Sequence, residues 1–140
     1  MSLGGQRIVE LGCGLAVPSL AAARAGADVL ATDANADALA LVPRNAELND
    51  VRIDTAAVDW GEPAALVKRA PFDLVLAADV LYTRAAVAQL LSLLPSLAPQ
   101  ALIADPGRSS ADAFIEEASH RWEVETVHRG VARIHRLQLV

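Results

Sequence analysis

Short runs of apolar residues alternate along this chain with longer segments whose apolar residues recur at helical spacing. The apolar runs predict five strands, at residues 7–10, 28–32, 51–58, 72–78 and 101–105. The segments between them predict helices over residues 16–25, 35–48 and 83–94, and a further helix that Ser109 or Ser110 would cap. Such alternation is typical of an α/β domain built on a parallel sheet.

Prolines indicate where two of these helices are interrupted. Pro43 lies inside the second predicted helix, where it removes a hydrogen bond and clashes with the preceding turn, so we expect a kink or break at 42–43. Pro95 and Pro99 follow the helix predicted to end at Leu94.

The last part of the chain has a different pattern. Residues 123–128 alternate between apolar and polar, Arg129-Gly130 supplies a turn, and residues 131–140 form another strand-like run. We therefore expect five strand–helix units followed by a hairpin. A domain that binds only a dinucleotide has no reason to end in this way.

Composition narrows the class of protein. The 140 residues predict one domain, and 54% hydrophobic with 4% aromatic residues predicts a core of Ala, Leu and Val. The net charge of −5, with no basic cluster, argues against nucleic-acid binding, and no apolar stretch reaches the length of a membrane span.

The single cysteine, Cys13, excludes an internal disulfide and is compatible with a cytoplasmic protein. His120, His128 and His135 are expected at the surface, and no metal site is expected.

A glycine turn near the start of the chain is the first candidate for chemistry. Gly12 and Gly14 separate the first predicted strand from the first helix, an arrangement that brings backbone N–H groups against a small charged ligand. Asp33 ends the next apolar run, 19 residues after Gly14, within reach of ribose hydroxyls. The alternative role for Asp33 is to cap the following helix, together with Asn35.

The residue at position 17 separates two ligand classes. A dinucleotide-binding turn would have a third glycine there, and this chain has Val17. The pattern is instead Glu10-x-Gly12-x-Gly14-x-Ala16, which resembles the class I (seven-strand) S-adenosylmethionine-dependent methyltransferases, with Ala16 in place of the family's last glycine.

Later segments extend this resemblance. Asp59-Trp60, the tetrapeptide Asp79-Val80-Leu81-Tyr82 and the segment from Ala104 to Arg108 look like the protein-lysine and nicotinamide-type N-methyltransferases of methyltransferase family 16. The resemblance implies a Rossmann-like, doubly wound seven-strand sheet of order 3-2-1-4-5-7-6 with an antiparallel last strand. It implies S-adenosyl-L-methionine as cofactor.

The resemblance also assigns residues to a site. The residues that it implies for the cofactor are Glu10, Gly12, Cys13, Gly14, Asp33, Ala34, Asp59, Trp60 and Ala78. Asp79 is the candidate to hold an acceptor amine, and Tyr82 is the candidate to offer its ring face to a cation. The alternatives are a helix cap for Asp79, ordinary packing for Tyr82 and Cys13, and a core position for Trp60. Asp105 and Arg108 are either part of the same edge or incidental charges in a Pro-Gly turn.

These residues predict an N-methyltransferase that acts on a protein lysine or a terminal amine. A small-molecule amine methyltransferase and a catalytically silent cofactor-binding domain that acts through a partner are the alternatives. Family members carry a segment before the first strand that covers the cofactor, and only residues 1–6 precede it here. We therefore expect a single domain over residues 1–140 without this lid, whose open site a second copy or a partner chain could cover.

Overall fold

The computed structural model describes residues 2–140, which form a single sheet with helices on both faces. The strands are β1 (Arg7–Leu11), β2 (Asp28–Asp33), β3 (Asp54–Ala57), β4 (Leu74–Ala78), β5 (Gln100–Asp105), β6 (Trp122–Arg129) and β7 (Ala132–Leu139). The helices are α1 (Val17–Arg24), α2 (Ala36–Leu48), α3 (Ala64–Val67), α4 (Arg84–Leu97) and α5 (Ser109–Ala118).

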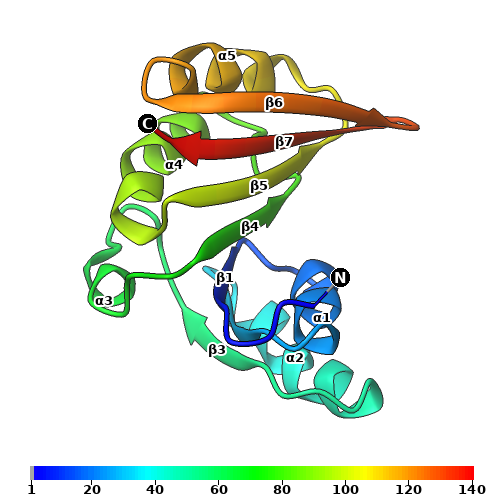
Figure 1. Cartoon of the computed structure of the whole chain (residues 1–140). Coiled ribbons are helices and arrows are strands. Elements are labelled where there is room, and N and C mark those ends of the chain that lie inside the picture. The colour runs from blue at the N-terminus through cyan, green and yellow to red at the C-terminus, as the bar shows by residue number, and fades with distance from the viewer. Residues whose placement is uncertain (1) are drawn as a thin grey trace.

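The seven strands lie in the order β3-β2-β1-β4-β5-β7-β6 (Figure 1). Strands β1 to β5 pair in parallel, and β7 is antiparallel to both of its neighbours, β5 and β6. The expected strand order and the antiparallel last strand are confirmed. Parallel pairing places the carboxyl ends of β1 to β5 at one edge of the sheet, which is where ligands bind in such folds.

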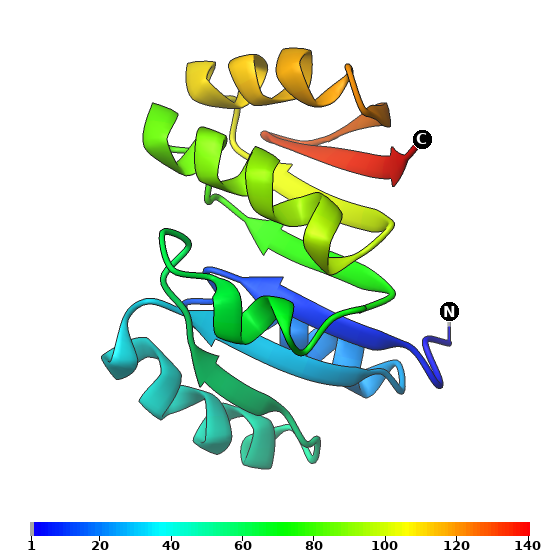
Figure 2. The same ribbon diagram turned by 90° about the vertical axis from the view of Figure 1, so that its left-hand side faces the viewer.

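The sheet separates two apolar cores because successive side chains of a strand point to opposite faces. Val9 and Leu11 of β1 belong to the core beneath α3, α4 and α5, the helices on the near face of the sheet in Figure 2. Ile8, on the opposite face, packs with residues of α1 and α2. Glu10 follows the same alternation and therefore points toward the α1 side.

Two helices continue through prolines that were expected to interrupt them. Of the kink or break expected at 42–43, the break is wrong, because α2 runs from Ala36 to Leu48 with Pro43 inside it. The expected end of α4 at Leu94 is also wrong, because α4 ends at Leu97, beyond Pro95. Buried residues on both sides of each proline explain this result: Val42 and Ala46 in α2, and Leu94 and Leu97 in α4. Burial of these side chains outweighs the single hydrogen bond lost at each proline.

Three further differences are local. Strand β3, at the edge of the sheet, pairs with β2 over only four residues, Asp54 to Ala57. The short helix α3 was not expected. Neither Ser109 nor Ser110 caps α5, whose N-cap residue is Arg108, and the Ser110 hydroxyl instead donates to the carbonyl oxygen of Leu81.

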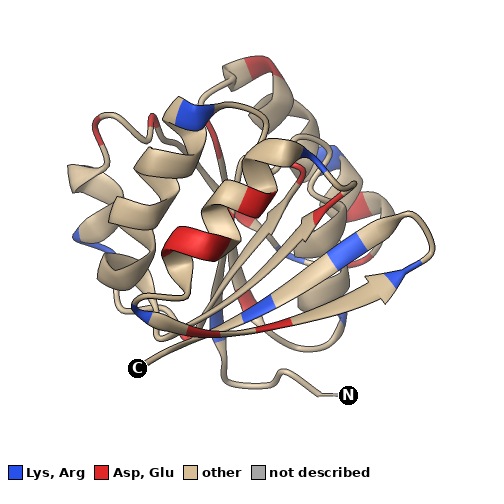
Figure 3. Ribbon diagram, turned by 90° about the horizontal axis from the view of Figure 1, so that it is seen from above, with Lys and Arg blue, Asp and Glu red and all other residues tan. Residues whose placement is uncertain are grey.

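The C-terminal hairpin carries charges of both signs. Acidic positions of β6 lie beside basic positions of β7 along the hairpin (Figure 3), and Glu125 is the register partner of Arg136. Over residues 2–140, no helix is both long enough and apolar enough to cross a bilayer.

Candidate functional site

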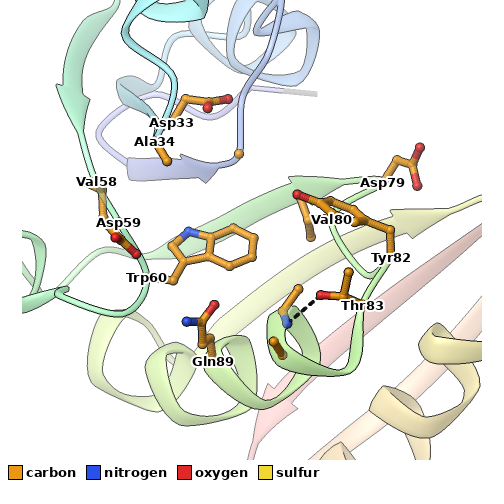
Figure 4. A pocket seen from close by; sticks show the side chains of 13 residues that line it. Asp33, Ala34, Val58, Asp59, Trp60, Asp79, Val80, Tyr82, Thr83 and Gln89 are labelled. Atoms are coloured by element: carbon orange, nitrogen blue, oxygen red, sulfur yellow. Dashed lines mark hydrogen bonds between the residues drawn. The ribbon is translucent and has the colours of Figure 1, made fainter.

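A pocket of about 320 Å³ opens at the carboxyl ends of β2, β3 and β4 (Figure 4). Its volume falls in the range of roughly 300–1,000 Å³ that is usual for small-ligand sites. The residues that line it are Gly12, Asp33, Ala34, Val58, Asp59, Trp60, Asp79, Val80, Tyr82, Thr83, Ala85, Ala86 and Gln89. Seven of the eleven residues expected in the site are therefore brought together: Gly12, Asp33, Ala34, Asp59, Trp60, Asp79 and Tyr82.

The glycine turn forms one wall of this pocket. A Cβ on Gly12 would lie 2.9 Å from the Val80 Cγ1 atom and 3.6 Å from the Trp60 ring, and its φ of +63° is in the left-handed region. Glycine is required here because any other side chain would collide with Val80. Ala16 also adopts a left-handed conformation, with φ 61°. The family's glycine would adopt this conformation without strain, so the alanine retains the turn at an energetic cost.

Asp33 joins the turn to the pocket. Its Oδ2 atom accepts a hydrogen bond from the Gly14 N–H at 2.9 Å, and its Oδ1 atom accepts one from the Asn35 N–H at 2.8 Å. The N-cap residue of α2 is Asn35, whose side chain accepts from the Asp37 N–H. Asn35 rather than Asp33 therefore caps α2. Asp33 instead stabilises the glycine turn and lines the pocket.

Glu10 does not line the pocket. Its Oε1 atom accepts from the Ser19 hydroxyl at 2.7 Å and from the Ser19 N–H at 3.1 Å, which ties β1 to the first turn of α1. Burial raises the pKa of the Glu10 carboxyl to about 7, although the hydrogen bonds from Ser19 oppose this shift.

Cys13, Gly14 and Ala78 also lie outside the lining. The Cys13 N–H donates to the Thr32 carbonyl oxygen at 2.8 Å, so Cys13 fastens the turn to β2. Burial raises the pKa of the Cys13 thiol to about 12, which keeps it protonated and unreactive. Ala78 ends β4 directly before Asp79.

An aromatic ring and a carboxylate follow β3. The Trp60 ring lies across the middle of the pocket, between Ala34 and Gln89 (Figure 4). It is half-buried and packs against the core beneath α4. Asp59 accepts a hydrogen bond from the Gly61 N–H at 2.8 Å through its Oδ1 atom, which shapes the loop after the strand.

Asp79 is held by an arginine from the next strand's loop. The Arg108 Nε atom donates to Asp79 Oδ1 at 2.7 Å, and Nη2 donates to Oδ2 at 3.1 Å. The Arg108 guanidinium lowers the pKa of the Asp79 carboxyl. Asp79 has a φ of 52°, a conformation that is costly for a residue with a Cβ and that recurs at functional sites.

A buried polar cluster lies behind this pair. Asp105, fully buried, accepts a hydrogen bond from Arg133 at 3.0 Å through Oδ1 and pairs with His135 through Oδ2. The other ring nitrogen of His135 lies 2.8 Å from the Thr126 hydroxyl. The expected surface position is therefore wrong for His135, which is 1% exposed because its partners on β5 and β6 surround it.

A second hollow adjoins the pocket. A groove of about 800 Å³ runs between α4 and α5 and shares Tyr82 and Thr83 with the pocket. Val87 and Leu91 of α4 lie along it, opposite Ala113 of α5. Tyr82 is 62% exposed where the two hollows meet.

Comparison with known proteins places this geometry in a family. The profile of a family described as "Lysine methyltransferase" matches residues 1–119. The chain is 31% identical over 137 residues to protein N-lysine methyltransferase METTL21A of Danio rerio, which covers 91% of this chain and 62% of the relative. It is 26% identical over 135 residues to histone-arginine methyltransferase METTL23 of Homo sapiens, covering 91% of this chain and 71% of the relative.

The chain belongs to the lysine methyltransferase family. The resemblance read from the sequence is thereby confirmed. The chain spans 62% of the length of METTL21A, the first of these relatives.

Solved structures share the fold of this family member. Magnesium protoporphyrin IX methyltransferase of Synechocystis, with bound SAM, matches with a TM-score of 0.76 and 16% identity over 99% of this chain and 72% of that one. The 16S rRNA methyltransferase RsmC of T. Thermophilus, in complex with AdoMet and guanosine, matches with a TM-score of 0.80 and 17% identity over 98% of this chain and 38% of that one.

Sequence reasoning missed several residues of the site. Gln89, Ala85 and Ala86 line the pocket from the first turns of α4, and no local pattern marks them. The sequence predicts Thr83 at the start of a helix but does not mark it as part of the site. It caps α4 by accepting from the Ala86 N–H at 3.0 Å, and this capping pattern was the available signal.

The charge of the lining indicates what the pocket can hold. Asp33, Asp59 and Asp79 contribute carboxylates, and within the described part of the chain no Lys, Arg or His lines the pocket. A ligand with a phosphate chain would face three carboxylates, of which only Asp79 is paired with a cation, Arg108, whereas a cationic ligand with hydroxyl groups suits this donor set. The residues present therefore fit S-adenosylmethionine, which carries a sulfonium, an amino group and a ribose.

Proposed function

We propose that this protein is an S-adenosylmethionine-dependent N-methyltransferase that acts on a protein amine, a lysine side chain or a terminal amine. The observation that carries the proposal is the convergence of three strand-end carboxylates and the Gly12 turn on one pocket, with no Lys, Arg or His among the described residues that line it. Its membership of the lysine methyltransferase family supports the same reaction class.

Each residue of the cofactor side has a role in this proposal. Asp33 would bind the ribose hydroxyls, because a carboxylate has about four lone-pair sites and two N–H groups leave some of them free. Asp59 and Trp60 would hold the adenine, with Ala34 beside its ring. Gly12 and Gly14 would admit the amino-acid end of the cofactor close to the backbone. Glu10, Cys13 and Ala78 would contribute by fixing the backbone of that wall.

The acceptor side needs orientation and a free lone pair rather than a protein nucleophile. When bound, the cofactor supplies a methyl group made electrophilic by its sulfonium. Asp79 would accept an N–H of the acceptor amine and direct its lone pair toward that methyl group. Tyr82, exposed at the mouth, would offer its ring face to the positive charge that develops.

The groove between α4 and α5 favours a protein acceptor over a small amine. Its volume of about 800 Å³ exceeds what a lysine side chain needs, and it leads directly from the pocket past Tyr82. A polypeptide that presents its amine at Asp79 would have room for its neighbouring residues along Leu91 and Ala113. A small amine would leave this groove without a function in the reaction.

Two measurements test the proposal. Calorimetry with S-adenosylhomocysteine and with NAD should show binding of the first ligand alone, and NAD binding without S-adenosylhomocysteine binding would contradict the proposed class. Tritiated S-adenosylmethionine incubated with the protein and a whole lysate should then label material of protein mass. Label confined to small molecules would support the small-amine alternative, and cofactor binding without any label would support a silent domain.

A further inference from the structure

The Arg108 side chain binds the Asp79 carboxylate, which the proposed function uses to orient the acceptor amine. Its two hydrogen bonds to Asp79, at 2.7 and 3.1 Å, form a bidentate pair that engages both carboxylate oxygens. The pair is accessible, with 45% of the Arg108 side chain and 51% of the Asp79 side chain exposed. An acceptor that reaches Asp79 therefore meets a carboxylate already paired with a guanidinium.

The loop that carries Arg108 is fixed by a buried group. Asp105 Oδ1 accepts from the Gly107 N–H at 2.6 Å and from the Arg108 N–H at 3.2 Å. Asp105 is itself anchored to β7 by Arg133 and His135. The buried Asp105 thus holds the loop in the position that places Arg108 beside Asp79.

The remaining charges around this position are mostly negative. The other titratable and charged groups that surround it are Asp33 of β2, Asp59 after β3, Tyr82 and Arg84 at the start of α4, and Asp105 of β5. Arg84 lines the adjoining groove rather than the pocket, and Arg133 and His135 already pair with Asp105. Arg108 is therefore the cation that offsets the charge of Asp79.

We propose that Arg108 is a specificity-determining residue, which occupies one edge of Asp79 and offsets its charge so that the acceptor position takes an uncharged primary amine. The inference rests on the proposed function, because it assumes that Asp79 receives the acceptor. The pair uses two of about four lone-pair sites on the carboxylate, so an N–H of an amine can still bind.

This arrangement excludes two competing acceptors. An unpaired carboxylate would favour an ammonium, which has no lone pair with which to react. A guanidinium binds a carboxylate best through a bidentate edge, and Arg108 holds that edge. In the reaction, the lone pair of the amine nitrogen forms the new bond to carbon, the carbon–sulfur bond breaks with its electrons left on sulfur, and the nitrogen releases one proton to water.

The test measures probe binding to the protein saturated with S-adenosylhomocysteine, followed by NMR from pH 7 to pH 10.5. The probes are n-butylamine for a lysine side chain and methylguanidine for an arginine side chain. In the wild type, butylamine should bind more tightly as the pH rises and more amine is uncharged, and methylguanidinium should bind more weakly than butylamine at pH 10.

Replacing Arg108 should change the preference of the site from the uncharged amine to cationic probes. Arg108→Gln should bind both cationic probes about tenfold more tightly at pH 7, because Asp79 then has an unbalanced charge. Arg108→Lys retains the charge and should retain the wild-type pH dependence. Arg52→Gln, which removes the cation of the exposed Arg52–Asp54 pair at 3.6 Å, is the matched control and should change nothing.

Several results would overturn the inference. They are equal pH dependence in the wild type and Arg108→Gln, tighter binding of methylguanidinium than of butylamine by the wild type, and no butylamine binding at pH 10. In each of these cases S-adenosylhomocysteine still binds, so the cofactor part of the proposed function stands. No binding of S-adenosylhomocysteine would overturn the proposed function and the inference with it. Where Arg108→Gln does not fold, two of these wild-type results, tighter binding of methylguanidinium than of butylamine and no butylamine binding at pH 10, still overturn the inference.

Discussion

Asp33 both shapes the glycine turn and faces the pocket, so its replacement tests the cofactor site. Asp33→Ala should lower the affinity for S-adenosylhomocysteine ten- to a hundredfold, since a charge-assisted hydrogen bond contributes about 1.5–3 kcal/mol. Calorimetry measures this change. Asp28→Ala, at the other end of β2 and exposed, is the control and should bind normally. Unchanged binding by a folded Asp33→Ala protein would leave Asp33 with only its role in the turn.

Asp79 should act on the acceptor rather than on the cofactor. Asp79→Asn keeps one acceptor oxygen but cannot stabilise the positive charge that develops on the amine nitrogen. We expect methyl transfer to slow by about tenfold or more, while S-adenosylhomocysteine binding is retained. A methyl-transfer assay beside calorimetry separates the two effects. Equal turnover of the two proteins would refute the role, and weakened cofactor binding would reassign Asp79 to the methionine end of the cofactor.

The buried Glu10 carboxyl should make the stability of the protein depend on pH. The folded protein raises the pKa of this carboxyl from 4.5 to about 7, so the folded state binds its proton more tightly than the unfolded state does. The contribution of Glu10 to stability is therefore fully present below about pH 4.5 and is lost as the pH rises to about 7. Glu10→Gln stays neutral and retains the acceptor for Ser19.

Urea unfolding at pH 5 and pH 7.5 measures this contribution. Between these values the free energy of unfolding of the wild type should fall relative to that of Glu10→Gln, by up to about 3 kcal/mol. Parallel changes in the two proteins would show that Glu10 titrates normally.

Helices α2 and α4 show that burial decides where a helix ends when it competes with a proline. Pro43 is exposed on α2, so its replacement removes no buried contact. Pro43→Ala should raise the free energy of unfolding by about 1–2 kcal/mol, because residue 43 regains an N–H that donates to the carbonyl of residue 39. Urea unfolding tests this gain, and Pro106→Ala, in an exposed loop, should show none. Equal effects at the two positions would remove the helical explanation.

The cluster around Asp105 joins the C-terminal hairpin to the strand that supports the site. Burial raises the pKa of the Asp105 carboxyl, but hydrogen bonds from His135, Arg133 and the Gly107 N–H outweigh it, and the net pKa is lowered. The stabilisation by Asp105 is therefore present above the unfolded pKa and is lost as the pH falls through the lowered folded pKa.

Asp105→Ala should destabilise the whole protein by about 3–5 kcal/mol, because it leaves Arg133 and His135 without their buried partner. Asp112→Ala breaks the second salt bridge of Arg133, at a carboxylate whose side chain is 66% exposed, and should change stability by about 1 kcal/mol or less. Thermal unfolding compares the two variants. Similar effects would contradict the importance of the buried cluster.

Much of the site follows from local rules, and the exceptions have identifiable causes. Asp33, Asp59 and Asp79 each follow an apolar run, and parallel pairing brings the ends of those runs to one edge. Glu10 lies at the same edge, but the alternation of side chains along β1 turns it toward α1. The alternation was visible in the sequence, whereas Ser19 as its partner depended on how α1 packs. Gln89 reaches the pocket because α4 packs across β4, a contact that no local pattern contains.

The sequence by itself determined the elements other than α3, the glycine turn and the edge where the carboxylates gather, because each depends on residues close together in the chain. The tertiary structure alone decided which charged groups of the site pair with one another. Asp79 and Arg108 are 29 residues apart, and Asp105 and His135 are 30 apart. These pairs form only because β5 lies beside β4 on one side and β7 on the other. Hydrogen bonds act over about 3 Å, so which groups meet depends on the neighbours of each strand rather than on their spacing in the chain.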